Sequence, residues 1–155
     1  MPYLHYDDPD FFENWPKEFA PFQERMRDHE TLRLAYFLMG DSADNAPVAV
    51  ALEIAPGESI PRHAHTCHRF EIVVRGTLHA DGVTLKPGDV MISEPGVLYG
   101  PNVAGPEGCT TYEIFGDYEG ARSTLLPDEN GKMVAYDVND IEATREFEEK
   151  ADWGK

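Results

Sequence analysis

The sequence predicts an all-β protein built as an antiparallel sandwich or barrel. Short runs of strand-forming residues recur between positions 31 and 116, and Gly and Pro separate them at short intervals. Helical periodicity is almost absent between these positions, which argues against alternating strand and helix units. At 155 residues the chain is expected to form one domain with one core.

The predicted strands are apolar or alternating runs bounded by turn residues. They cover 31–38, 48–54, 70–74, 77–80, 90–93 and 109–115. Asp81-Gly82 is typical of a two-residue hairpin loop, and Gly76 is expected to break the strand that precedes it. The strands should therefore be short and joined by tight turns.

Three segments are expected along the chain: an N-terminal arm over 1–30, a barrel over 31–120 and a C-terminal extension over 121–155. Short helices are predicted near 21–28 and over about 140–150. The arm carries too many aromatic side chains for a free tail, so we expect it to pack on the barrel or on a partner subunit of a homodimer. These side chains are Tyr3, Tyr6, Phe11, Phe12, Trp15, Phe19 and Phe22.

Charge and composition exclude several partner classes. The net charge of −16 and the lack of a basic cluster argue against nucleic acid and anionic membranes as partners. The apolar runs are far shorter than the ~20 residues of a membrane span. The first ten residues lack the basic and apolar regions of a signal peptide, and Cys67 and Cys109 are too few for a disulfide scaffold. We therefore expect a cytoplasmic protein.

The stretch from Gly57 to Gly76 carries most of the chemistry. His63 and His65 are two positions apart, so in an extended strand both imidazoles point to the same face, as metal ligands do. The same face continues through Arg69 and Glu71. So much polar chemistry on one buried face indicates a functional site.

Two motifs in the sequence resemble those of the cupin family. The first is formed by Gly57, His63-x-His65 and Gly76, and the second by Gly88-Asp89, Glu94-Pro95-Gly96, Tyr99 and Asn102. The similarity extends over about 48–115. The resemblance implies an antiparallel jelly-roll barrel, also called a double-stranded β-helix, that is often dimeric. It also implies a metal ion in the barrel mouth, held by three histidines and a glutamate.

The chain departs from the cupin pattern at two of these four ligands. Arg69 occupies the glutamate position and Tyr99 occupies the position of the third histidine. A guanidinium has no acceptor for a cation. His63 and His65 could still bind Fe, Mn, Ni or Zn, completed by Glu71 or a Tyr99 phenolate. The alternative is a buried, hydrogen-bonded histidine pair in a protein that has lost its metal.

The remaining candidates each have two interpretations. Glu71 could be a metal ligand or a catalytic base, and Tyr99 a ligand, a general acid or an aromatic residue at the rim. Arg69 could bind a substrate carboxylate with its planar fork, or pair with Glu71. His68 is expected to face outward in an unbroken strand, although a bulge would turn it inward.

Two function classes follow from these candidates. The first is a small-molecule enzyme with a divalent metal in the barrel mouth that acts on a small oxygenated or carboxylate-bearing compound. Dioxygenase, isomerase and lyase chemistry all remain open, because the fold hosts each of them. The second is a metal-free binding or sensing module in which Arg69 binds a small anion.

Overall fold

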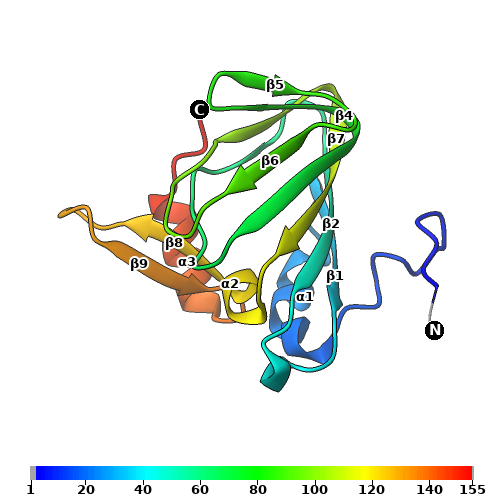
Figure 1. Ribbon diagram of the computed structural model, residues 1–155, viewed down its shortest axis with the longest axis horizontal. Coiled ribbons are helices and arrows are strands. Elements are labelled where there is room, and N and C mark those ends of the chain that lie inside the picture. The colour runs from blue at the N-terminus through cyan, green and yellow to red at the C-terminus, as the bar shows by residue number, and fades with distance from the viewer. Residues whose placement is uncertain (1–2, 155) are drawn as a thin grey trace.

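A computed structural model describes residues 3–154, so Met1, Pro2 and Lys155 at the ends of the predicted arm and extension lie outside the described part. The body of the molecule is an antiparallel barrel (Figure 1), which confirms the predicted fold class. Its strands are β1 Leu32–Leu38, β2 Val48–Ile54, β3 Ser59–Ile60, β4 Arg69–Ala80, β5 Val83–Leu85, β6 Val90–Ser93 and β7 Asn102–Phe115.

Two long strands, β4 and β7, organise the barrel. The strand order is β1-β2-β7-β4-β5, with β3 paired to β7 and β6 paired to β4. Gly76 does not end its strand, contrary to the prediction; the register with β7 shifts there and β4 continues to Ala80. With φ at +69° and a position where a Cβ would lie 2.0 Å from the Gly108 carbonyl oxygen, Gly76 makes a bulge that lets the strand bend. The hairpin at Asp81-Gly82 is confirmed.

The barrel interior changes character along its strands. At one end an apolar cluster contains Leu52, Ile54, Val73, Leu78, Ala104 and Cys109. Further along β4 the inward side chains become Glu71 and then Arg69, both fully buried. Beyond them a second apolar cluster contains Phe19, Phe22, Tyr36, Val48, Val50, Phe115 and Tyr118. A polar layer therefore lies inside the barrel between two apolar ones.

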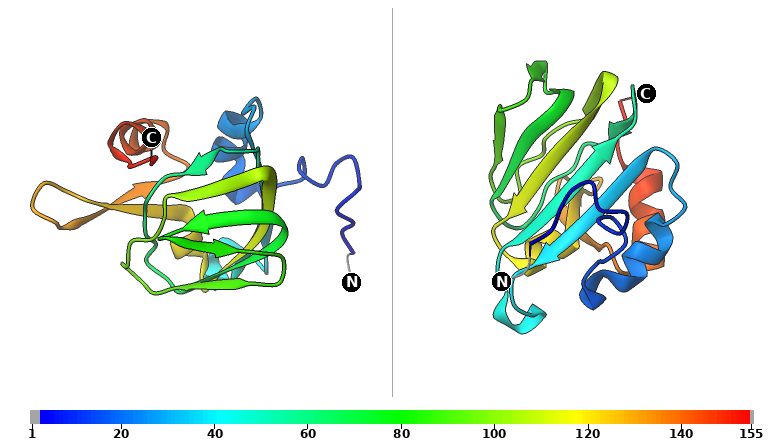
Figure 2. Two further views of the ribbon diagram at one scale, coloured as in Figure 1. Left: turned by 90° about the horizontal axis from the view of Figure 1, so that it is seen from above. Right: turned by 90° about the vertical axis from the view of Figure 1, so that its right-hand side faces the viewer.

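The N-terminal arm packs on the chain's own barrel. Phe11 contacts Ala35 of β1 and Ala51 of β2 on the outer face of the sheet, where Figure 2 shows the arm crossing these strands. The arm then enters η1 (Lys17–Phe19) and α1 (Ala20–Met26), whose aromatic side chains pack against Tyr36. A further short helix, η2 (Ser42–Asp44), joins β1 to β2.

The predicted homodimer stays a prediction. The outer face of β4 and β6 exposes large apolar side chains that a second copy could cover. They are Phe70, Val74, Val90 and Ile92. Apolar side chains gathered in this way are common at protein interfaces.

The predicted C-terminal extension begins within α2 (Tyr118–Arg122). It continues through the hairpin β8 (Ser123–Pro127) and β9 (Met133–Asp137) to α3 (Ile141–Lys150). The predicted helix is confirmed, and Asp140 caps it by accepting from two backbone N–H groups. The hairpin was not predicted. Helices α1 and α3 lie on the same side of the barrel (Figure 2). Within residues 3–154, no helix is both long and apolar enough to cross a membrane.

Candidate functional site

The histidine stretch is held between the barrel and the C-terminal extension. His63 exchanges backbone hydrogen bonds with Tyr99, at 3.2 and 3.0 Å, which places these two side chains next to each other. Ala64 makes the same exchange with Leu125 of β8, at 3.1 and 2.8 Å. His63 and His65 are buried. The extension is therefore part of the site, although the resemblance to cupins did not cover it.

Backbone carbonyl groups fix which nitrogen of each imidazole carries the proton. His63 Nδ1 lies 2.7 Å from the Pro61 carbonyl oxygen, and His65 Nδ1 lies 2.9 and 2.8 Å from those of Gly120 and Ser123. A carbonyl oxygen can only accept, so both Nδ1 atoms donate. In a neutral imidazole the other nitrogen, Nε2, is then a bare acceptor. The two Nε2 atoms face each other at 3.1 Å.

Burial keeps these groups uncharged. It lowers the pKa of His63 to about 4 and that of His65 well below 6.5, so both imidazoles are neutral at neutral pH. Burial also raises the pKa of Tyr99 well above 10, so Tyr99 is a phenol. Its hydroxyl lies 2.7 Å from His63 Nε2 and donates to it. Two unprotonated nitrogens cannot form a hydrogen bond with each other. Since His63 Nε2 already accepts from Tyr99, the His65 lone pair is the one left for an electrophile.

The histidine pair has the donor chemistry of a metal site. Histidine ligands commonly donate their second ring N–H to a backbone carbonyl, as both do here. Among residues 3–154, however, no group of three or more His, Cys, Asp and Glu side chains is placed to hold a metal ion. The neighbouring side-chain atoms that could serve as donors to a divalent ion are His63 Nε2, His65 Nε2 and the Tyr99 oxygen.

Glu71 forms a buried ion pair with Arg69. Arg69 donates to Glu71 Oε2 at 2.9 Å, Asn102 donates to the same oxygen at 3.1 Å, and Thr111 donates to Oε1 at 3.1 Å. Both carboxylate oxygens are therefore engaged. The sequence left open whether Arg69 pairs with Glu71, and the structure forms that pair.

Glu113 is the site residue that sequence reasoning missed. It lies directly opposite Glu71 on the neighbouring strand, and Arg69 Nη1 donates to Glu113 Oε1 at 2.5 Å. The guanidinium thus bridges two facing carboxylates and also stacks on the Tyr99 ring, at 4.2 Å from its centroid. Burial raises the pKa of Glu113 to about 7. The positive charge of Arg69 opposes this shift in part, and the negative charge of Glu71 adds to it.

His68, His79 and Cys67 stay out of the site. His68 and His79 are exposed, and the nearest carboxylate oxygen to His68 is 3.9 Å away on Glu94, itself exposed. The expected outward direction of His68 is thus confirmed. Cys67 is buried in the second apolar cluster.

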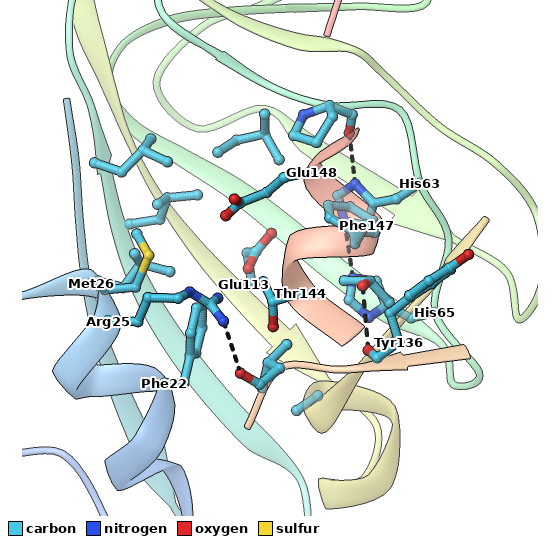
Figure 3. Close-up of a pocket in the computed structure, with 18 of the residues that line it drawn as sticks. Phe22, Arg25, Met26, His63, His65, Glu113, Tyr136, Thr144, Phe147 and Glu148 are labelled. Atoms are coloured by element: carbon cyan, nitrogen blue, oxygen red, sulfur yellow. Dashed lines mark hydrogen bonds between the residues drawn. The ribbon is translucent and has the colours of Figure 1, made fainter. Parts of the chain in front are cut away.

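A cavity of about 150 Å³ opens beside the histidines. Helices α1 and α3 and strand β1 each contribute three side chains to its wall, and most of the lining side chains are apolar. His63 and His65 lie on one side and Arg25 of α1 on the other, while Glu113 and Glu148 project between them (Figure 3). A cavity of similar volume in another protein holds a benzene-sized molecule. The arrangement thus joins a few polar groups to a small, mostly apolar chamber, as ligand sites do.

Solved structures of cupins share this fold. An RmlC-like cupin from Ralstonia eutropha JMP134 matches with a TM-score of 0.53 at 14% identity, over 76% of this chain and 71% of that chain. One from Shewanella frigidimarina NCIMB 400 matches with a TM-score of 0.50 at 25% identity, over 61% and 83% of the two chains. A variant of the oxalate decarboxylase of Bacillus subtilis matches with a TM-score of 0.52 at 16% identity, over 68% and 28%.

The chain therefore has the cupin fold, as its two motifs predicted. Proteins that share this fold include enzymes. The sequence matches no protein-family model and no curated protein.

Proposed function

We propose that the protein is a small-molecule enzyme that holds a divalent metal ion on His63 and His65 beside the cavity. The observation that supports this proposal is the pair of unprotonated Nε2 atoms that converge at 3.1 Å, each imidazole being fixed by a hydrogen bond from its Nδ1 to a backbone carbonyl. Imidazole donors without a carboxylate suit Fe(II), Ni(II) and Zn(II) better than Mn(II). Tyr99 is the third candidate donor.

Each residue of the site has a role in this proposal. A metal ion held there would polarise an oxygen atom of the substrate. Glu113 lines the cavity, and its pKa of about 7 suits a group that accepts and returns a proton at neutral pH. The cavity wall is mostly apolar, and the Tyr99 hydroxyl, 2.7 Å from His63 Nε2, would turn its oxygen toward the metal in place of donating to that nitrogen. Proton transfer of the isomerase or lyase kind is therefore favoured over oxygenative cleavage.

Metal analysis tests this proposal. Protein prepared without a chelating tag is expected to carry close to one divalent ion per chain, and His63→Ala and His65→Ala are expected to lose it. A metal present at a hundred times its dissociation constant would add about 2.7 kcal/mol to the free energy of unfolding, so a thermal melt gives a second measure. His68→Ala and His79→Ala are matched controls, since both side chains are exposed, and they should keep the metal.

Metal-free protein whose melting temperature ignores added Fe(II), Ni(II), Zn(II) and Mn(II) would contradict the proposal. One observation favours the second candidate function, a metal-free binding module. The Tyr99 hydroxyl already donates to His63 Nε2, so the histidine pair has one partner within the chain. The same metal analysis separates the two functions.

Glu113→Gln is expected to change how stability depends on pH. Burial raises the pKa of Glu113 from 4.5 to about 7, so the folded protein holds a proton that the unfolded chain releases. Through this group, stability is highest below pH 4.5 and falls as the pH rises to about 7, by on the order of 3 kcal/mol. Gln keeps an acceptor for Arg69 but does not titrate.

Denaturant unfolding of both proteins at several pH values measures this effect as a difference. His63 and His65 act in the opposite sense, because their lowered pKa values favour folding at higher pH, and they are present in both proteins. Their contribution therefore cancels. A difference between wild type and variant that stays constant from pH 4.5 to 7 would show that Glu113 is not protonated as described.

A further inference from the structure

Arg25 is a cation in the cavity wall that forms no ion pair with any residue of 3–154. Among the described residues that line the cavity, it is the one Lys or Arg side chain. Its guanidinium lies 4.8 Å from the centroid of the Phe22 ring. Its one hydrogen bond runs from Nη1 to the Val138 carbonyl oxygen at 3.5 Å, the limit of such an interaction.

One further donor of Arg25 is unsatisfied. The Nε atom is buried without a hydrogen-bond partner. A guanidinium carries five N–H donors, and buried donors without acceptors are costly and uncommon. Within residues 3–154 no carboxylate forms an ion pair with Arg25, although the charge of Glu148 acts on it from a distance. The half-buried Arg25 side chain lines the cavity, so an acceptor inside the cavity could satisfy its unpaired donor.

We infer that Arg25 binds the carboxylate of a small carboxylic acid in this cavity, an inference that rests on the proposed function. A planar guanidinium matches a carboxylate with two parallel hydrogen bonds. The cavity volume of about 150 Å³ limits the acid to about the size of an aromatic ring with one substituent. Glu113 and Glu148 line the same cavity, so a singly charged acid is favoured over a phosphate dianion.

A carboxylate bound to Arg25 would fix the orientation of the substrate in the cavity. Arg25 and the histidine pair lie on opposite sides of the cavity (Figure 3), so a carboxylate on Arg25 directs the rest of the molecule toward His63 and His65. Glu113 then lies along the molecule between Arg25 and the histidine pair. Arg25 thus selects the substrate class, and it takes the role of anion partner that the sequence suggested for Arg69.

Calorimetric titration of the full chain with matched acids and amides tests this inference. The probes are propionate and benzoate, each paired with its neutral amide. Wild type is expected to bind the acids at least about tenfold more tightly than the amides, and Arg25→Gln is expected to weaken acid binding by about 10- to 100-fold. Arg25→Lys keeps the positive charge but loses the planar pair of donors. Its affinity for the acids should therefore lie between those of wild type and Arg25→Gln. Arg27→Gln, at an exposed position after α1, is the matched control and should bind as wild type does.

Acids that bind no more tightly than their amides, or an Arg25→Gln protein that binds acids as wild type does, would overturn the inference. The titrations are run on metal-free and on Zn(II)-loaded protein. Arg25-dependent acid binding by a chain that holds no metal supports the inference while the metal proposal fails. Metal binding that depends on His63, together with equal binding of acids and amides, supports the metal proposal and overturns the inference about Arg25.

Discussion

Arg69→Met is expected to lower the free energy of unfolding by about 3 to 5 kcal/mol. Met retains the apolar stem, but the change removes the charge that bridges Glu71 at 2.9 Å and Glu113 at 2.5 Å. These carboxylates face each other on adjacent strands, where like charges repel. Since the Arg69 and Glu71 side chains are at most 1% exposed, water cannot replace the lost partner. Denaturant unfolding measures the loss.

Two comparisons separate this effect from a general cost of mutation. Arg33→Met breaks an ion pair of similar length, 3.0 Å to Glu53, but the Arg33 side chain is 59% exposed. That control should cost no more than about 1 kcal/mol. Replacing Glu71 and Glu113 by Gln in the Arg69→Met background removes the stranded charges and should restore part of the stability. Unchanged stability in Arg69→Met would show that the bridge is not structural, and would return Arg69 to the candidates for ligand binding.

The inward face of the histidine stretch could be predicted from the sequence alone. His63, His65, Arg69 and Glu71 are all buried, as their spacing indicated. The alternation survives even though the chain between His65 and Arg69 is not a regular strand. Extended backbone has a side-chain period of two whether or not both neighbours pair with it. Local geometry was therefore sufficient for this part of the site.

The partners that complete the site depend on contacts between distant segments. Glu113 alternates with Thr111 and Phe115, so its inward direction could have been read from the sequence. Its position opposite Glu71 could not, because that depends on the register between β4 and β7. The carbonyl groups of Gly120 and Ser123, which fix the His65 ring, carry no side-chain signal at all. For the same reason the extension was predicted as a separate segment.

Gly120→Ala is expected to disturb both stability and the metal site. A Cβ at this position would lie 2.1 Å from Cys67 Sγ and 2.5 Å from Cys67 Cβ, so α2 must move away from the buried Cys67. Overpacking of this kind typically costs about 1 to 3 kcal/mol. The same movement displaces the Gly120 carbonyl oxygen, which lies 2.9 Å from His65 Nδ1. Loss of such a partner typically weakens metal affinity by about 10- to 100-fold.

Thermal melts and metal titration of Gly120→Ala measure the two effects separately. Glu119→Ala changes the neighbouring, exposed residue of α2 and should alter neither. Adding Cys67→Ala to Gly120→Ala removes the closer clash, at Sγ, but keeps the Cβ contact, so it should restore stability and metal affinity in part. A Gly120→Ala protein that is destabilised yet binds metal as tightly as wild type would show that the carbonyl bond does not position His65. A Gly120→Ala protein whose stability and metal affinity both equal those of wild type would show that α2 does not pack against Cys67 as closely as described.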